Sequence, residues 1–398
     1  MVAGVLALAP AAFGQDSSIL VQCPETTDLH PTGEGITCFN LTGGDGMVTM
    51  ADDIQRPLYV FGFSTVPEGG PAVNSPEYPG YLMDNGTLAA NAPAPTLEVD
   101  EDDEVFLTLT NVGMAMRPDL FDAHSVHWHG FPQAASIFDG VPDSSVAIGM
   151  GASVTYYYNA KDAGTYLYHC HVEATEHMQM GMLGSLYVRP RQDRLPDGTD
   201  LAGHVHHTGD RYAYNDGDGS TRYDVAYPVQ ISTFDPAFHD ASFSVQPLPF
   251  ASMRDTYFLL NGRGYPDTVN PDVLYSEDPL GRSQPSQPVS SLITAAAGER
   301  VLLRISNVSV TQFNTIATNG IPMTVVGLDA RLLRDQAGNN LSYQTQSLTL
   351  GGGQSADVIL DTSGLAPGST YFLYTTNLHQ LANDVENFGG LMTEIRVE

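Results

Sequence analysis

The stretch from residue 164 to residue 190, GTYLYHCHVEATEHMQMGMLGSLYVRP, places several potential metal ligands between two segments that are typical of β-strands. GTYLYHC and GSLYVRP are short and rich in Tyr, Leu and Val, which favours strands. The potential ligands are His169, Cys170, His171, His177 and Met182. We therefore interpret this stretch as the metal-binding part of a β-protein and the rest of the chain as its scaffold.

A second group of potential ligands comes earlier in the chain. DAHSVHWHGF, residues 122–131, has histidines at positions 124, 127 and 129. One thiolate, two imidazoles and one thioether form a soft ligand set, which suits a type 1 copper site with two His and one Cys in a plane and a weak axial Met. The predicted type 1 ligands are His124, Cys170, His177 and Met182.

Each of these residues alone has a simpler interpretation. A lone Cys is more often a small buried residue than a ligand. The alternating Met178, Met180 and Met182 are also typical of one face of a buried strand. The joint occurrence of thiol, imidazole and thioether groups in two nearby segments nevertheless favours metal binding.

The two segments resemble the copper motifs of the multicopper oxidases, the laccase-like family, and more loosely those of copper nitrite reductases. The resemblance covers mainly residues 95–190, and it implies cupredoxin domains and bound copper. By resemblance, Asp139 in FDGVPD corresponds to an acidic residue that assists proton transfer. The pairs that correspond to ligands of a type 2/type 3 copper cluster are His127 with His129 and His169 with His171.

The spacing departs from this family at one place. Five residues, 172–176, separate the His-Cys-His triplet from His177, whereas the family more often has three. The five-residue step from His177 to Met182 matches the family. We therefore keep both residues as predicted ligands and expect only the intervening loop to differ.

The composition limits the function classes. The chain has 398 residues, with 46 Asp and Glu against 16 Lys and Arg, and a formal net charge of −30. So acidic a chain is not expected to bind nucleic acid or an anionic membrane surface. Its length suits two domains with a sizeable core.

The first residues suggest export. Residues 1–14, MVAGVLALAPAAFG, resemble the apolar part and small-residue cleavage site of a signal peptide. This run is too short to span a membrane, and no later segment qualifies. We therefore expect a periplasmic or extracellular protein, the alternative being a disordered N-terminus. In an oxidising compartment Cys23 and Cys38 could pair, although two free thiols remain an alternative.

Short alternating segments recur along the rest of the chain, from PLYVFGFST at 57–65 to LMTEIRVE at 391–398, with Gly, Pro, Asn and Asp between them. They predict an all-β protein of two Greek-key β-sandwich domains, which the resemblance makes cupredoxin-like. The expected division is a signal-peptide-like segment 1–14, an extension 15–55, a copper-binding domain 56–190, a linker 191–225 and a second domain 226–398 without copper motifs.

The second domain and the linker do not restore the missing motifs. The second domain has FNTI at 313–316 and TNLH at 376–379 where the family's motifs are expected. The linker contains His204, His206 and His207, which could bind metal but are more typical of a solvated loop. A complete trinuclear cluster in the family uses four His-x-His pairs, and only two are present in the first domain. The missing half could come from another subunit, from His204 and His206 or from a different chain, or it could be absent. Of these we expect a partner surface over the cluster, and the family suggests a homotrimer.

Three functions remain open from the sequence. The first is a laccase-like oxidase that takes single electrons from a small molecule or metal ion and reduces dioxygen. The second is a nitrite-reductase-like enzyme with a type 2 copper held by His129, His169 and a histidine of a neighbouring subunit. The third is a non-enzymatic type 1 copper protein that carries electrons or stores copper. The histidines on either side of Cys170 favour the first, because a simple carrier has no need of them.

Overall fold

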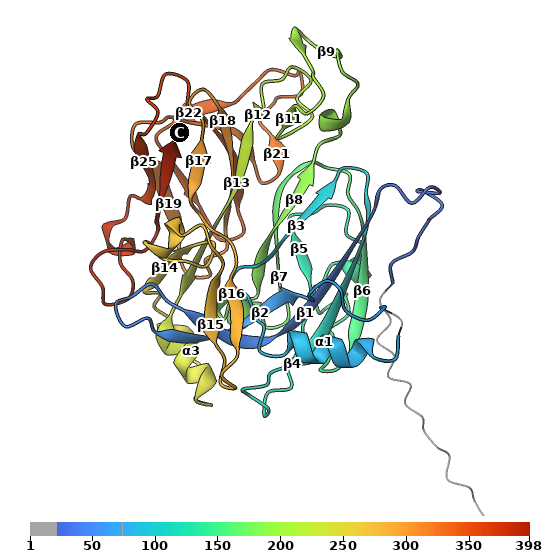
Figure 1. Ribbon diagram of the computed structural model, residues 1–398, viewed down its shortest axis with the longest axis vertical. Coiled ribbons are helices and arrows are strands. Elements are labelled where there is room, and N and C mark those ends of the chain that lie inside the picture. Colours follow the sequence, from blue (N-terminus) through green and yellow to red (C-terminus); the bar gives the residue numbers. More distant parts are fainter. Residues whose placement is uncertain (1–21, 74) are drawn as a thin grey trace, which may run out of the picture.

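A computed structural model describes residues 22–73 and 75–398. Its strands form two sandwiches side by side, with the blue-to-green strands of the first on the right and the yellow-to-red strands of the second on the left (Figure 1). The predicted all-β fold with two sandwich domains is thereby confirmed. The signal-peptide-like segment 1–14 lies outside the described residues.

The first domain has two four-stranded sheets, of order β2-β1-β4-β6 and β3-β8-β7-β5. Alternating apolar residues of both sheets meet in one core, which includes Trp128, Tyr156 and Tyr158. The strands are β1 (Ile36–Thr49), β2 (Pro57–Thr65), β3 (Ala94–Asp100), β4 (Glu104–Gly113), β5 (His127–His129), β6 (Ser153–Asn159), β7 (Gly164–His169) and β8 (Leu183–Arg189). The helices are α1 (Tyr78–Gly86), the 3-10 turn η1 (Ser136–Phe138) and α2 (Ala174–Gln179).

The second domain repeats this topology. Its β13 pairs in parallel with β18 and antiparallel with β14, as β1 does with β4 and β2. Likewise β25 lies between β26 and β19, as β7 lies between β8 and β5. The strands are β13 (Val225–Phe234), β14 (Tyr257–Leu260), β17 (Ile293–Ala295), β18 (Arg300–Asn307), β19 (Asn314–Thr318), β20 (Met323–Leu328), β21 (Arg331–Leu332), β22 (Tyr343–Thr345), β23 (Ser347–Leu350), β24 (Ser355–Asp361), β25 (Thr370–Thr375) and β26 (Met392–Val397).

Shorter elements lie around the second sandwich. The short helices and strands of this domain are α3 (Pro236–Phe243), η3 (Phe250–Ser252), η4 (Asp267–Val269), β15 (Leu274–Glu277), β16 (Ser283–Gln287) and η5 (Leu378–Gln380). No helix in the described part of the chain is both long and apolar enough to cross a membrane.

The expected linker 191–225 has more structure than a solvated loop. It contains η2 (Arg191–Arg194) and two small hairpins, formed by β9 (Asp200–Leu201) with β10 (His204–Val205) and by β11 (Arg211–Tyr212) with β12 (Arg222–Tyr223). The buried carboxylate of Asp216 accepts hydrogen bonds from Gln192, Thr221 and nearby backbone N–H groups. The polar residues of this segment therefore satisfy one another.

The strand β1 lies inside the segment that we expected to be an extension, residues 15–55. Its Thr-Gly-Gly-Asp-Gly sequence is more typical of a turn, yet the strand occupies the interior of a sheet. The glycines are required by close neighbours: a Cβ on Gly43 would lie 3.2 Å from the His124 ring, and one on Gly44 would lie 2.8 Å from Val112. The sheet thus passes directly beside the predicted copper ligands.

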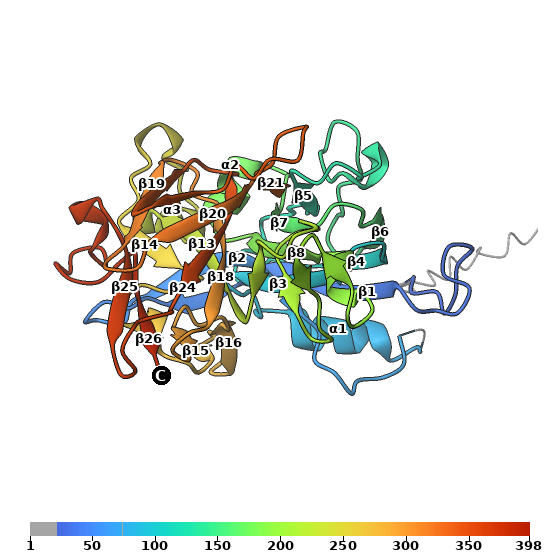
Figure 2. The same ribbon diagram turned by 90° about the horizontal axis from the view of Figure 1, so that it is seen from above.

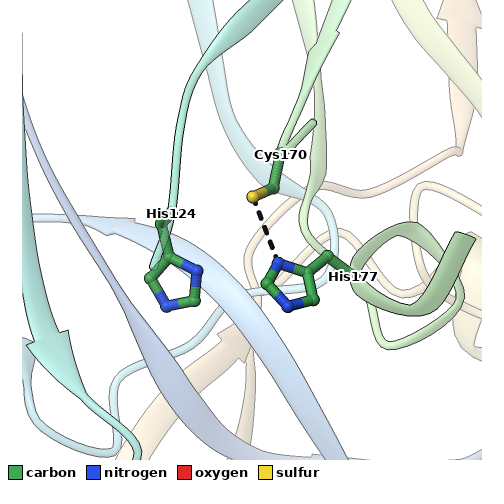
Figure 3. Close-up of side chains that lie close together, drawn as sticks. All are labelled: His124, Cys170 and His177. Atoms are coloured by element: carbon green, nitrogen blue, oxygen red, sulfur yellow. Dashed lines mark hydrogen bonds between the residues drawn. The ribbon is translucent and has the colours of Figure 1, made fainter. Parts of the chain in front are cut away.

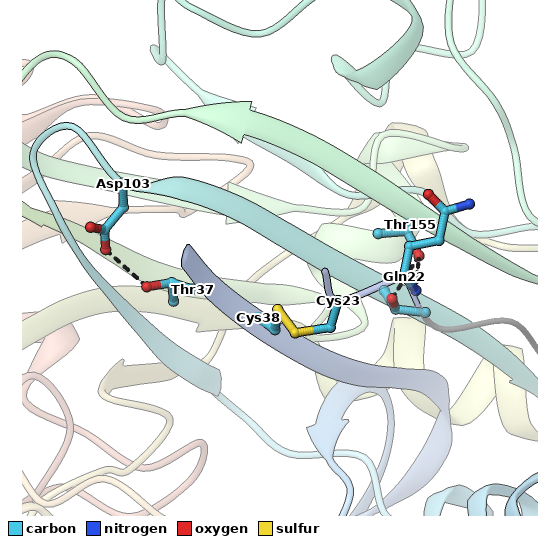
Figure 4. Close-up of a disulfide and its surroundings, with 7 residues drawn as sticks. Gln22, Cys23, Thr37, Cys38, Asp103 and Thr155 are labelled. Carbon is cyan, nitrogen blue, oxygen red and sulfur yellow. Dashed lines mark hydrogen bonds between the residues drawn. A yellow bond between two sulfur atoms is a disulfide. The ribbon is translucent and has the colours of Figure 1, made fainter. Parts of the chain in front are cut away.

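A disulfide joins Cys23 to Cys38, so the first of the two alternatives for these residues is confirmed. Figure 4 shows the bond between the chain near Gln22 and strand β1, where Thr37 donates a hydrogen bond to Asp103 (2.8 Å). The backbone N–H of Gln22 also donates to the hydroxyl of Thr155 (3.2 Å). These contacts hold the start of the described chain against the first sheet.

The two domains share an interface in which β7 and β8 of the first contact β13, β18 and β24 of the second (Figure 2). The hydroxyl of Thr165 on β7 donates to Asp357 on β24 (2.6 Å), and the hydroxyl of Ser355 donates to the carbonyl of Thr165 (2.6 Å). The interface is therefore built on the strand that leads to His169.

Candidate metal centre

Strand pairing places four histidines together. In the antiparallel pair β5–β7, His127 lies opposite His169 and His129 lies opposite Leu167. Side chains alternate along a strand, so His127 and His129 point to one face while Trp128 between them points into the core. The same alternation places His169 and His171 on one side and Cys170 on the other. The three consecutive residues 169–171 therefore contribute to two separate sites, Cys170 to one and the two histidines to the other.

The first site is formed by His124, Cys170 and His177, which converge from a loop, a strand end and helix α2 (Figure 3). One ligand atom from each lies within 4.8 Å of the others, and all three residues are buried. The Sγ of Cys170 is 3.1 Å from Nδ1 of His177. Met182 is also buried, and its backbone carbonyl accepts the N–H of Cys170 (3.1 Å).

These residues fit a bound metal. His124 is fully buried, and neither of its ring nitrogens has a hydrogen-bond partner among the described residues. A buried polar group without a partner is costly, but a metal ion would satisfy it. The thioether of Met182 lies at the same site, because its methyl group and the His124 ring both lie beside Gly43. Thiolate, imidazole and thioether donors favour copper.

The ionisation of the pair Cys170–His177 also suits a metal. Burial raises the pKa of the Cys170 thiol, but the adjacent His177 and His124 outweigh this effect and lower it to about 5. Burial lowers the pKa of His177, but the Cys170 thiolate and the Asp122 carboxylate raise it to about 10. Without metal the pair is a thiolate and an imidazolium, and a cation that displaces the His177 proton finds the thiolate already formed.

A short helix accounts for the unusual spacing before His177. Residues 174–179 form the short helix α2, which begins after Glu173, a residue in the left-handed region (φ 45°). The helix turns Nδ1 of His177 toward Cys170, while its Nε2 faces the carboxylate of Asp122 at 3.4 Å. Asp122 was not among the predicted residues. Its only sequence signal is its position two residues before His124.

The second site contains the other four histidines. The rings of His127, His169 and His171 are mutual neighbours, with centroids 5.1 to 5.6 Å apart. Ligand atoms of His127, His129 and His169 lie within 4.8 Å of one another. Nδ1 of His129 is 3.3 Å from Nε2 of His169. The structure therefore brings together all four residues of the two predicted His-x-His pairs.

Backbone carbonyls orient two of these rings. Nδ1 of His127 donates to the carbonyl of Asp139 (2.6 Å), and Nδ1 of His169 donates to the carbonyl of Cys170 (2.8 Å). A carbonyl only accepts, so each Nδ1 carries the proton and each Nε2 keeps its lone pair for a metal. Burial lowers the pKa of His127 and of His129, and it lowers that of His169 to about 3. The imidazoles are thus neutral, as ligands must be.

Asp139 lies beside this second site. It follows η1, and its carboxylate Oδ1 is 3.4 Å from Nδ1 of His127. The side chain is about one-third exposed. The carboxylate is therefore close to one ring of the cluster and also partly open to the solvent.

Two domain profiles of the multicopper oxidases match the chain, over residues 83–193 and 246–392. The chain belongs to the multicopper oxidase family. Copper is therefore the metal to which these donors correspond.

Individual relatives cover the chain unevenly. Laccase-1 of Emericella nidulans is 38% identical over 109 residues, which is 26% of this chain and only 16% of that protein. The copper-containing nitrite reductase of Alcaligenes xylosoxydans xylosoxydans is 26% identical over 272 residues, 65% of this chain and 71% of that protein. The blue copper oxidase from Nitrosomonas europaea has the same fold, with a TM-score of 0.63, 21% identity and coverage of 91% and 86% of the two chains.

The second domain of this multicopper oxidase has polar residues where the first has copper motifs. The pairing of β25 with β26 matches Tyr374, Thr375 and Thr376 with the His-Cys-His triplet, since the N–H of Thr375 donates to Leu391 as that of Cys170 donates to Met182. Amide side chains bond to one another here: Gln380 donates to Asn314 (3.1 Å). Asn314 in turn donates to Ser309 (2.8 Å), so the polar atoms are satisfied without a metal.

The remaining histidines do not join the two sites. His206 is buried with Nδ1 3.1 Å from the hydroxyl of Tyr212, and His204 is 3.3 Å from the same hydroxyl. His239 is buried, and its Nδ1 donates to the carbonyl of Tyr59 (2.5 Å). No group of metal-ligating side chains found within residues 22–73 and 75–398 includes these three. His379 of the second domain is exposed, with Nδ1 2.7 Å from Asn377 Oδ1.

Proposed function

We propose that the protein is a laccase-like copper oxidase that takes single electrons at the site of His124, Cys170, His177 and Met182. His127, His129, His169 and His171 would hold the copper that receives these electrons and at which dioxygen would be reduced. Copper, when bound, supplies the one-electron chemistry at both sites. The observation that supports this proposal is the position of Cys170 between two histidines of the second site.

The chain's own residues provide a short electron path. Cys170 is a ligand of the first site, and its direct neighbours His169 and His171 point into the second. An electron therefore needs to cross only one or two backbone units. The carbonyl of Cys170 also accepts the His169 Nδ1 proton (2.8 Å), which connects the two sites by a hydrogen bond. Asp139 is placed to transfer protons at the second site, since reduction of dioxygen to water consumes them.

A nitrite-reductase-like enzyme is a second candidate. It is favoured by the match that covers 71% of the nitrite reductase of Alcaligenes xylosoxydans xylosoxydans. Against it, a type 2 copper held by His129, His169 and one histidine of a neighbour would leave His127 and His171 without a ligand role. Both of these rings lie within the cluster. We therefore prefer the oxidase.

The proposal includes an assembly. Four histidines are too few for three coppers, so a second copy must cover the cluster, and a homotrimer is the closed arrangement that the family suggests. The second domain exposes Phe313 and Leu378, at 74% and 81% of their surface, near the residues that replace the copper motifs. These two side chains are the proposed contact surface for the second copy. We also propose that the protein is exported to the periplasm or the extracellular space, in keeping with its disulfide.

Copper content and acceptor use together test the function. Purified protein loaded with copper is analysed for copper per chain and assayed for dioxygen uptake and nitrite reduction, with a phenol or Fe²⁺ as electron donor. More than two coppers with dioxygen uptake is the expected result. About two coppers with nitrite reduction supports the second candidate. About one copper with neither activity identifies a carrier.

A further inference from the structure

The outer nitrogen of His129 faces the second domain of its own chain. His127 and His169 direct their outer nitrogens to carbonyls of the first domain. Nε2 of His129 instead points to the loop at 351–353, where a Cβ on Gly353 would lie only 2.7 Å from it. Gly353 also has a φ of +88°. A side chain at position 353 would therefore strain the backbone and clash with the His129 ring.

A cavity of about 300 Å³ opens at this place between the domains. His129, Thr165 and Leu167 line it from the first domain, and the second domain contributes Asp329, Gly353 and Gln354. Asp329 is the only carboxylate among the lining residues, and no Lys or Arg is among them. Arg304 lies nearby, bonded to Thr165 (3.2 Å), but its charge is balanced by Asp357 at 3.5 Å.

The β20–β21 hairpin fixes the position of Asp329. Asp329 and Ala330 are the two central residues of its turn, and both have positive φ, 49° and 55°. A two-residue type I′ turn requires this conformation at both positions. Here Ala330 is buried against Gly164 at the start of β7, and Asp329 Oδ1 accepts the N–H of Ser355 (3.0 Å).

We propose that the second domain positions one histidine of the cluster in its own chain, with Asp329 as the positioning residue for His129 and Gly353 as the residue that leaves room for its ring. No direct ion pair joins the two side chains, so the carboxylate acts on the outer nitrogen of His129 through a bridging water, which fixes the ring and increases its basicity. The proposal rests on the proposed function, because it concerns the same cluster.

The first test compares Asp329→Asn with Asp335→Asn in the full-length protein. Asp335 is a matched control, because it is also an acidic turn residue of the second domain that accepts backbone N–H groups, but it does not line the cavity. In copper titrations against a chelator, Asp329→Asn is expected to weaken the second site about ten-fold or more and to leave the blue type 1 absorption unchanged. The copper signal of the second site is expected to recover in Asp329→Glu. Equal copper affinity in both Asn variants would overturn the role of Asp329.

The second test separates this inference from the proposed function. In the metal-free protein, the ring resonances of His129 are expected to shift in Asp329→Asn and to stay in place in Asp335→Asn. If they shift but the wild-type chain binds one copper, the contact stands and the proposed function fails. If they do not shift, the contact itself is refuted.

A third comparison isolates Gly353. Gly353→Ala is paired with Gly338→Ala, since Gly338 has nearly the same φ, +85°, and no atom within 4 Å of an added Cβ. The two positions have nearly the same positive φ, and Gly353→Ala adds the clash with His129, so it is expected to lose at least as much thermal stability as Gly338→Ala. Only Gly353→Ala is expected to lose copper at the second site. Full second-site occupancy in both would rule out the steric role.

Discussion

The Sγ of Cys170 and Nδ1 of His177 lie 3.1 Å apart, seven residues from each other along the chain, because helix α2 turns the histidine back toward the strand end. The two groups share one proton, which remains on the imidazole. This relationship makes Cys170 a preformed thiolate in a fully buried position.

Replacing the thiolate is expected to remove the first site without unfolding the protein. Cys170→Ser preserves the size of the side chain, so the fold should stay intact, but the hydroxyl is a poor copper ligand at neutral pH. We expect loss of the intense blue absorption and of dioxygen uptake, with little change in circular dichroism. A Ser variant that stays blue would show that Cys170 is not the ligand.

The pH dependence of the metal-free protein follows from the same pair. The pKa of Cys170 is lowered to about 5 and that of His177 is raised to about 10. The stabilising ion pair is therefore present between these values. It is lost below pH 5 as the thiolate is protonated, and above pH 10 as the imidazolium is deprotonated. Ultraviolet thiolate absorbance, compared with Cys170→Ser, should titrate with a midpoint near 5, and a midpoint near 9 would contradict the pairing.

Removing the carboxylate near the second site should slow proton transfer. Asp139→Asn keeps the backbone carbonyl that bonds His127, so the ring orientation is preserved. We expect dioxygen uptake to fall about 100-fold, while reduction of the blue copper by the donor keeps its rate. Asp143→Asn, in an exposed position of the same loop, is the control. Similar activities of the two variants would exclude a role for Asp139.

Disrupting the exposed apolar residues should separate the proposed trimer. The double variant Phe313→Ser with Leu378→Ser is expected to sediment as a monomer and to lose dioxygen uptake, while the blue absorption remains. Leu280→Ser is a control, because Leu280 is 70% exposed but lies in the β15–β16 turn. A fully active monomer would show that one chain completes the cluster by itself.

The disulfide should affect stability more than copper binding. Cys23 and Cys38 close a loop of fifteen residues. Replacing both by Ser is expected to reduce the free energy of unfolding by about 3 kcal/mol, since the unfolded chain gains freedom. Chemical denaturation measures this loss, and copper content should stay constant. A large loss of type 1 copper would instead show that the disulfide holds β1, and with it Gly43, against His124.

The chemistry of the two sites was evident from the sequence, because metal ligands are rare residue types in a short, fixed order. His124, Cys170 and His177 were predicted as ligands, and the structure brings them together. The alternation of side chains along a strand makes the His-x-His pairs face one way, and that rule acts locally. The disposition of His127 and His129 could therefore be predicted from spacing alone.

Only the tertiary structure decided which distant residues surround these ligands. β1 was missed because its glycines are typical of turns, and their reason, the closeness of His124 and Val112, exists only in the packed sheet. Asp329 and Gly353 are about 200 residues from His129 and have no local signal, because their position depends on how the second sandwich packs on β7. Ligand identity is a property of the residue type, whereas the surroundings of a ligand depend on the packing of both domains.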